Sequence, residues 1–464
     1  MYNQPLSRRS FLRGVTATVT TGALLASGLS GCAVTPAQAP QGSAAPAQEG
    51  VTLRKMAWGS PLEKANIENG LAQFMDQNPG IKVEYIHTPD RYQEVLQTML
   101  SAGDAPDVYK MGGYYADLAV REALVDITDS VKSDDVLGDP DYFFPFEEER
   151  STVNGRWYGI GSTFQWRLLY YNTAVFADAG IEPPDTDPAN TWSWDKFVEV
   201  TTQLTVDSNG NHPGDANFNV EDVQQWGFFT PDSMYDNFIF SNGGAVIDGD
   251  TEKYVLDQPA AYEAVQAFAD LRLKNQVAAQ GSVLEQMGMN AWQMLGGGRV
   301  AIIQDGNWAL QDISKAGFEF GVGIQPMLTE PASVVGSSWT GIYSKTEHPE
   351  EAWQLFRYLN LDDYQAGLVR VGLWGVSHRT LLTPDGVAKW WDDAVHPANW
   401  LPLEADYKLN YGHVIPNVIG ALKAGPMITQ ALGDVWVGTR TAEEVLTELN
   451  PQLNQVLEEE QARV

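Results

Sequence analysis

A regular alternation of strand-like and helix-like segments between residues 51 and 111 is the feature that most restricts the fold of this chain. Apolar runs at residues 51–58, 81–85 and 107–111 predict three strands. The first helix is expected to begin at Ser60-Pro61-Leu62-Glu63, which combines an N-cap serine, a proline at the first helical position and a glutamate placed for a capping box. A second helical stripe follows Asp90. This order predicts a parallel sheet with helices on both faces.

A second set of strands and helices follows the turn at residues 154–159. Residues 166–171 predict a strand, residues 191–197 open a helix, and residues 262–269 mark another helix with its apolar face on a core. Chains longer than about 250–300 residues usually divide into domains. We therefore expect an α/β protein of two lobes, with a ligand site in the cleft between them.

The charge of the chain excludes one class of partner. It has 29 basic and 60 acidic residues, a formal net charge of −31. A surface of this sign repels nucleic acid, so no nucleic-acid partner is expected. With one cysteine, the chain can form no internal disulfide.

The N-terminal residues resemble an export and lipidation signal. The run SRRSFLR (7–13) is similar to the twin-arginine signal, and LSGC (29–32) is similar to a bacterial lipobox. We expect residues 1–32 to be the signal peptide, Cys32 to carry the lipid, and residues 33–50, rich in Ala, Pro, Gln, Gly and Ser, to form a flexible tether. The protein would then lie outside the cytoplasm, bound to the membrane through its N-terminal lipid alone.

Seven short segments together resemble the extracellular solute-binding proteins of ABC importers, in the group that binds maltose, other oligosaccharides and glycerol-3-phosphate. They are FMDQNPGIKV (74–83), AGDAPDV (102–108), NGRWYG (154–159), LYYN (169–172), SNGG (241–244), GGRVAI (297–302) and DGNW (305–308). The resemblance implies a type II-like periplasmic-binding-protein fold with hinges near residues 161–164 and 323–326. One lobe would comprise residues 51–161 plus 325–373, and the other residues 162–324 plus 374–464. It further implies a monomer that closes around its ligand and delivers it to the permease transmembrane subunits.

Aromatic side chains beside polar ones are the candidate ligand contacts, because a sugar ring stacks on an aromatic face while its hydroxyls need directional partners. The chain has fifteen Trp and eighteen Tyr residues. The candidates are Trp58, Gly113, Tyr114, Tyr115, Gln165, Tyr171, Trp226, Asp236, Asn237, Asp305, Trp308, Gly336, Ser338, Trp339, Trp374, Gly375 and Arg379. Related sugar binders place a stacking tryptophan at the position of Trp308. For any single tryptophan, core packing is the alternative, and for Arg379 it is a surface salt bridge.

Three functions remain open. Capture of a mono- or oligosaccharide is favoured, and binding of glycerol-3-phosphate or another small anion is the alternative. An exported glycoside hydrolase would need two carboxylates about 5–10 Å apart. The densest acidic run, residues 147–149, is expected to face solvent. We expect no catalytic residue, cofactor or metal, because the six histidines lack metal-ligand spacing and the loop from Asp207 to His212 has only part of a calcium pattern.

Overall fold

The computed structural model describes residues 50–464, apart from the side chains of Leu284 and Glu285. The expected signal and lipidation site, Cys32 included, and all but the last residue of the expected tether lie outside the described residues. No helix between residues 50 and 464 is long and apolar enough to cross a membrane.

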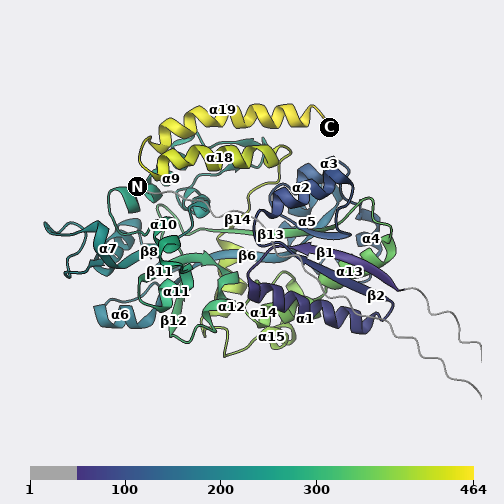
Figure 1. Ribbon diagram of the computed structural model, residues 1–464, viewed down its shortest axis with the longest axis horizontal. Helices are drawn as coiled ribbons and strands as arrows, with labels where there is room; N and C mark the ends of the chain where they lie inside the picture. Colours follow the sequence, from purple (N-terminus) through teal and green to yellow (C-terminus); the bar gives the residue numbers. More distant parts are fainter. Residues whose placement is uncertain (1–49) are drawn as a thin grey trace, which may run out of the picture. The chain divides into compact units, whose positions relative to one another are not determined.

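A ten-stranded sheet runs through the described part of the chain in the order β2-β1-β3-β13-β6-β11-β8-β7, with β12 also paired to β6 and β14 to β13 (Figure 1). Its strands are β1 (Val51–Ala57), β2 (Ile81–His87), β3 (Val108–Met111), β6 (Gly159–Asn172), β7 (Val206–Asp207), β8 (Val223–Phe229), β11 (Val300–Gly306), β12 (Phe320–Gly323), β13 (Ser333–Ile342) and β14 (Gly412–His413). Two short pairs lie outside it: β4 (Thr152–Val153) with β5 (Arg156–Trp157), and β9 (Ile247–Asp248) with β10 (Lys253–Tyr254).

The parallel arrangement predicted for the first three strands is confirmed, since β1 pairs in parallel with both β2 and β3. The sheet as a whole is mixed, because β13 pairs antiparallel with β3 and with β6. The strand expected at residues 166–171 is the second half of β6, which is 14 residues long. The long strands β6 and β13 join the part of the sheet that contains β1, β2 and β3 to the part built from β11 and β8.

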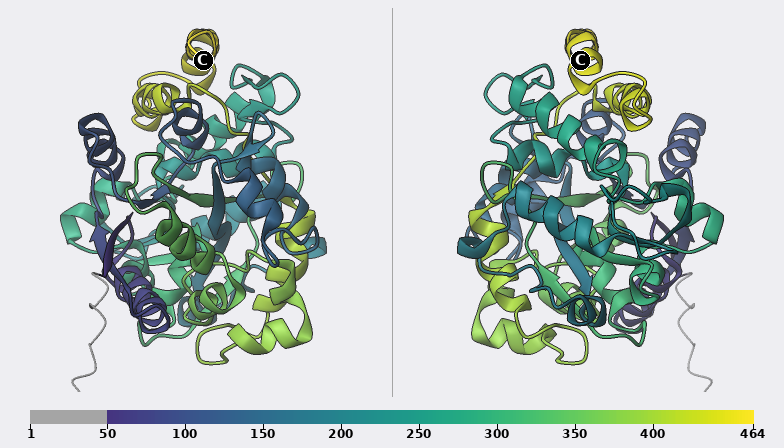
Figure 2. Two further views of the ribbon diagram at one scale, coloured as in Figure 1. Left: turned by 90° about the vertical axis from the view of Figure 1, so that its right-hand side faces the viewer. Right: turned by 90° about the vertical axis from the view of Figure 1, so that its left-hand side faces the viewer.

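The helices cover the sheet and its edges (Figures 1 and 2). They are α1 (Pro61–Gln77), α2 (Tyr92–Ala102), α3 (Tyr115–Val120), α4 (Thr128–Ser133), α5 (Pro145–Ser151), α6 (Thr173–Ala179), α7 (Trp194–Leu204), α8 (Asp236–Ser241), α9 (Pro259–Leu273), α10 (Gly281–Met287), α11 (Ala291–Gly296), α12 (Leu310–Ile313), α13 (Pro349–Leu359), α14 (Asp362–Arg370), α15 (Pro384–Trp390), α16 (Trp400–Pro402), α17 (Lys408–Asn410), α18 (Ala421–Trp436) and α19 (Ala442–Gln461).

Helix α1 begins as the sequence predicts. The Glu63 amide donates to Ser60 Oγ at 3.1 Å, and Ile67, Leu71 and Phe74 are buried. The other half of the expected capping box does not form, because the buried carboxylate of Glu63 pairs with Lys110 Nζ at 3.3 Å instead of with the Ser60 amide. The local motif therefore placed the helix start correctly, whereas the partner of Glu63 comes from β3.

The C-terminal helices α18 and α19 pack against each other and against α9 (Figure 1). The start of α18 also contacts α3, where both carboxylate oxygens of Asp117 accept hydrogen bonds, from the amides of Gly420 and Leu422, each at 2.9 Å. Asp117 thus satisfies two amides at the helix start that have no intrahelical partner.

Candidate ligand-binding cavity

A cavity of about 820 Å³ lies over the middle of β6 and β13. Its volume is within the range of small-molecule sites, about 300–1,000 Å³. It is lined by Gln93, Gly113, Tyr114, Arg150, Gln165, Arg167, Asp236, Val246, Ile247, Tyr254, Val334, Val335, Gly336, Ser337, Trp339, Ile415, Pro416, Asn417, Ala421, Gly425, Pro426, Ile428, Thr429 and Gln430. The lining therefore combines the loop after β3, both long strands, α8, the β9–β10 pair and α18.

The lining includes uncharged polar groups that have no partner among the side chains that the structure describes. The side-chain amide of Gln165 on β6 makes no hydrogen bond with the described residues, and the buried Tyr114 hydroxyl has none either. Burial raises the pKa of Tyr114, so its hydroxyl stays protonated at neutral pH. An amide and a hydroxyl both donate and accept, and a ligand hydroxyl could bond to either group.

Arg167 and Asp236 form an ion pair at the cavity surface. Arg167 Nη1 donates to Asp236 Oδ1, and Nη2 donates to Oδ2 at 3.1 Å. Their side chains are 15% and 12% exposed, so both can still reach the cavity. A two-point pair of this kind fixes the orientation of both groups and leaves no net charge.

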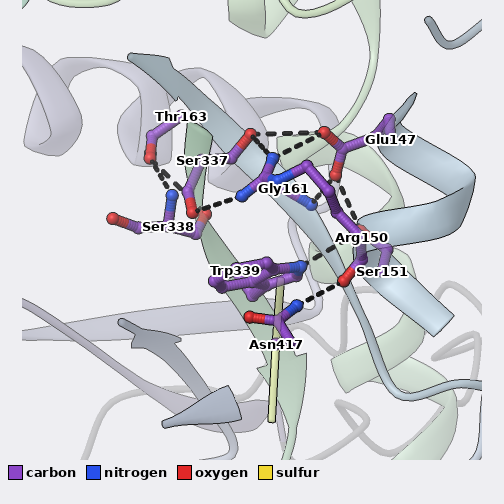
Figure 3. A network of polar contacts seen from close by, with 9 residues as sticks. All are labelled: Glu147, Arg150, Ser151, Gly161, Thr163, Ser337, Ser338, Trp339 and Asn417. Atoms are coloured by element: carbon purple, nitrogen blue, oxygen red, sulfur yellow. Dashed lines mark hydrogen bonds and ion pairs between the residues drawn. The ribbon is translucent and has the colours of Figure 1, made fainter. Parts of the chain in front are cut away.

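A second arginine is held by the network that Figure 3 shows. Arg150 Nη1 donates to Glu147 Oε2 at 3.1 Å and to Ser337 Oγ at 2.8 Å, while Nη2 donates to the Ser337 carbonyl at 3.0 Å. Glu147 Oε1 accepts from Ser151 Oγ and from the Gly161 amide. Burial lowers the pKa of Arg150, and the adjacent Glu147 opposes that shift. The network ties α5 to both β6 and β13.

The expectation that residues 147–149 face solvent is correct for Glu148 and Glu149 and wrong for Glu147, which is buried. Glu147 and Arg150 are three residues apart on α5, so they lie on one face of the helix and pair inside the protein. A charge run alone does not show which of its members turns inward.

The aromatic rings at the cavity are largely covered. Trp339 is only 4% exposed. Its ring stacks on Tyr115 with centroids 5.0 Å apart, the Arg150 guanidinium carbon lies 4.6 Å from its centroid, and its Nε1 donates to Ser151 Oγ at 3.1 Å. Tyr114 and Tyr254 are also buried. The cavity therefore shows ring edges and a hydroxyl more than the open ring faces that sugar stacking would use.

One side of the cavity is aliphatic. We call Val246, Ile247, Val334, Ile415 and Ile428 the aliphatic wall. Val246, Ile247 and Ile428 belong to the same hydrophobic cluster, and Val334 and Ile415 pack against that cluster. The wall is thus one continuous surface that is backed by the core around α9, α18 and α19.

The structure brings six of the sequence candidates together in the lining: Gly113, Tyr114, Gln165, Asp236, Gly336 and Trp339. The others lie outside it: Trp58, Tyr115, Tyr171, Trp226, Asn237, Asp305, Trp308, Ser338, Trp374, Gly375 and Arg379. Some of these support the cavity from behind. Asn237 is fully buried, and its Oδ1 accepts from the Val334 amide at 2.8 Å.

Two of the candidates outside the lining, Trp58 and Trp374, contact a buried lysine on β3. Lys110 Nζ lies 4.3 Å from the ring centroid of Trp58 and 4.9 Å from that of Trp374. Trp308 packs between two hydrophobic clusters. Arg379 forms a surface salt bridge, with its Nη1 atom 2.9 Å from Asp141 Oδ1.

The sequence reasoning missed several lining residues, including Arg150, Arg167 and Asn417. Arg167 could have been found, because residues two apart on a strand face the same side and Gln165 was already a candidate. Nothing local marks residues 415–417 or α18, which tertiary packing carries to the cavity.

Among the side chains that the structure describes, no group of three or more His, Cys, Asp or Glu residues could hold a metal ion. In the loop with part of a calcium pattern, the Asp207 carboxylate accepts from the amides of Asn209, Asn211 and Asn219. These bonds show that Asp207 organises its own loop.

The chain belongs to the bacterial extracellular solute-binding proteins, because residues 71–398 match the profile of that family. It is 20% identical over 306 residues to the maltotriose-binding protein of Pyrococcus abyssi, covering 64% of this chain and 60% of that protein. Its fold is similar to that of the substrate-binding protein Lmo0181 from Listeria monocytogenes in complex with cycloalternan (TM-score 0.76, 19% identity, 88% and 99% covered). It is also similar to maltose-bound T. maritima MalE3 (TM-score 0.71, 22% identity, 88% and 100% covered). The fold is therefore the two-lobed α/β fold of periplasmic solute-binding proteins, and the family is exported.

Proposed function

We propose that this protein captures a neutral mono- or oligosaccharide in the cavity over β6 and β13 and delivers it to an ABC permease. In this proposal the lobes are residues 51–161 plus 325–373 and residues 162–324 plus 374–464. They close around the ligand, and a lipid on Cys32 holds the monomer at the membrane. The observation that carries the proposal is the set of groups in the cavity: an unpartnered amide at Gln165, an unpartnered hydroxyl at Tyr114, and a neutral ion pair at Arg167 and Asp236.

The charge balance of the lining favours a neutral ligand over glycerol-3-phosphate. Both arginines that line the cavity already bind carboxylates, Arg150 with Glu147 and Arg167 with Asp236. A phosphate needs cations or several free amides to replace its water. Among the described residues, the cavity lining offers no arginine or lysine free of a carboxylate partner.

The lining also argues against glycoside hydrolysis. That reaction uses two carboxyl groups on either side of one bond. Of the residues that line the cavity, Asp236 alone carries a carboxylate, and it is engaged by Arg167. Similarity to a maltotriose-binding protein and to maltose and cycloalternan complexes agrees with capture of a sugar without chemistry.

The test is a titration of the purified chain with mono-, di- and trisaccharides and with glycerol-3-phosphate, followed by calorimetry and thermal shift. A ligand at 100 times its dissociation constant stabilises the fold by about 2.7 kcal/mol. Gln165→Ala should weaken binding about tenfold or more through the loss of one or two hydrogen bonds. The matched control is Gln280→Ala at an exposed position outside the cavity. Binding of glycerol-3-phosphate alone, or release of reducing ends from the sugars, would contradict the proposal.

A further inference from the structure

The aliphatic wall is the part of the cavity that a plain sugar does not explain. Three of its five members, Val246, Ile247 and Ile428, are buried, and Val334 and Ile415 are half-buried. They come from the segment before and within β9, from β13, from the segment before α18 and from α18 itself. The wall is therefore an assembled surface rather than one exposed apolar residue.

The wall offers a ligand hydroxyl no side-chain partner. Even the backbone amide of Val334 is occupied, because it donates to Asn237 Oδ1 at 2.8 Å. A hydroxyl pressed against these five side chains would lose its water and gain no hydrogen bond from them. An ordinary hexose carries hydroxyls around its whole edge, so it would meet that penalty at this end of the cavity.

The polar groups lie at neighbouring positions along the same two strands. Gln165 on β6 lies opposite Gly336 on β13, and Val334 is two residues before Gly336. Arg167, paired with Asp236, is two residues beyond Gln165. Because the two strands run antiparallel and Val335 pairs with Trp166, Arg167 lies level with Val334. The Arg167–Asp236 pair and the aliphatic wall therefore lie next to each other, about 7 Å along the strands from Gln165.

We propose that the natural ligand is a sugar with an apolar substituent, such as the methyl group of a 6-deoxy sugar or of an acetamido group, seated against the aliphatic wall. This inference rests on the proposed function and narrows its ligand class. The hydroxyls of the ligand would bind Gln165, Tyr114 and the Arg167–Asp236 pair, while the substituent replaces the hydroxyl that the wall cannot satisfy. In a hydrophobic pocket, one methyl or methylene group changes affinity about tenfold or more.

The experiment compares pairs of ligands that differ in this kind of substituent: glucose with 6-deoxyglucose, and cellotriose with tri-N-acetylchitotriose, which carries an acetamido group on each of its three rings. Calorimetry should show at least one substituted sugar binding about tenfold more tightly than its parent. Val334→Thr, which keeps the shape and adds a hydroxyl to the wall, should reduce that preference to threefold or less. Ile415→Thr provides a second variant on a different element, and both are checked for folding by circular dichroism.

The matched control is Val198→Thr on α7, which packs against the same hydrophobic cluster outside the cavity and should keep the full preference. Equal binding of parent and substituted sugars would overturn the inference and leave the proposed function standing. If no sugar in the set binds, the proposed function falls, and this inference falls with it. An equal loss of preference in the control variant would also overturn the role of the wall.

Discussion

Lys55 on β1 should be a source of instability. It is buried, and among residues 50–464 its ammonium makes no hydrogen bond or ion pair. The Tyr85 ring gives it a cation–π contact, with the ring centroid 5.2 Å from Lys55 Nζ. Burial and the neighbouring charge of Lys110 lower the pKa of Lys55 to about 7, against a partial opposing effect of Glu63. We predict that Lys55→Met stabilises the folded protein.

The size and pH dependence of the gain follow from that pKa. The fall from 10.5 to about 7, at about 1.36 kcal/mol per pKa unit, gives an upper value of roughly 5 kcal/mol. We expect about 3 kcal/mol at pH 6, since methionine forfeits the contact with Tyr85. Between pH 7 and 10.5 the unfolded chain binds a proton that the folded chain has lost, so wild-type stability rises with pH. The advantage of methionine should therefore shrink across this window and vanish near pH 10.5.

The assay is urea unfolding of wild type and variant at pH 6, 8 and 10, followed by circular dichroism. Lys82→Met on the neighbouring strand is the control, because the Lys82 side chain is 65% exposed. It should change the free energy of unfolding little at any of these pH values. A gain for Lys55→Met that stays constant from pH 6 to pH 10, or a loss of stability at pH 6, would refute the reasoning.

Three further outcomes are expected. Burial raises the pKa of Asp305 to about 6, against the opposing effect of the Gly306 amide. Between pH 4 and 6 the folded chain therefore binds a proton that the unfolded chain has lost, and wild-type stability falls as the pH rises. Asp305→Asn should stabilise the protein by about 2–3 kcal/mol in thermal melts at pH 7.5 and by little at pH 4. Asp117→Ala removes both hydrogen bonds to the start of α18, and should lower the free energy of urea unfolding by about 2 kcal/mol; an unchanged midpoint would contradict its capping role. Trp308→Ala should destabilise the protein by about 3 kcal/mol through lost packing. The variant should keep the thermal shift with ligand, because Trp308 lies outside the cavity. A folded variant without that shift would instead support the ligand role that the sequence suggests for this residue.

Much of the fold could be predicted from local patterns. The start of α1 and the parallel pairing of β1 with β2 and β3 follow from capping residues and apolar spacing, which act between near neighbours in the chain. The apolar stripe predicted after Asp90 was less accurate, because Tyr92 and Leu96 on α2 are buried while Val95 is 38% exposed. Periodicity marks which side of a helix is apolar, but the depth of each residue depends on what packs against it.

The candidate site was predictable only where it lies on one strand or in one loop. Gln165 follows from its position on β6, and Tyr114 follows from the Gly-rich loop after β3. Trp58 and Trp374 have equally suggestive surroundings in the sequence, yet the fold turns both toward Lys110. An aromatic ring serves a core and a ligand through the same apolar surface, so its residue type cannot distinguish these two uses.

The sequence by itself determined the alternation of strands and helices, the residues that begin α1, and the acidic charge that makes a nucleic-acid partner unexpected. It did so because these properties depend on composition and on residues a few positions apart. Tertiary structure alone decided that Glu147 turns inward to hold Arg150, that Asp236 neutralises Arg167, and that Ile415 and Ile428 complete an aliphatic wall. Each of these contacts joins segments or faces whose meeting depends on how the whole sheet is ordered, and no local pattern carries that information.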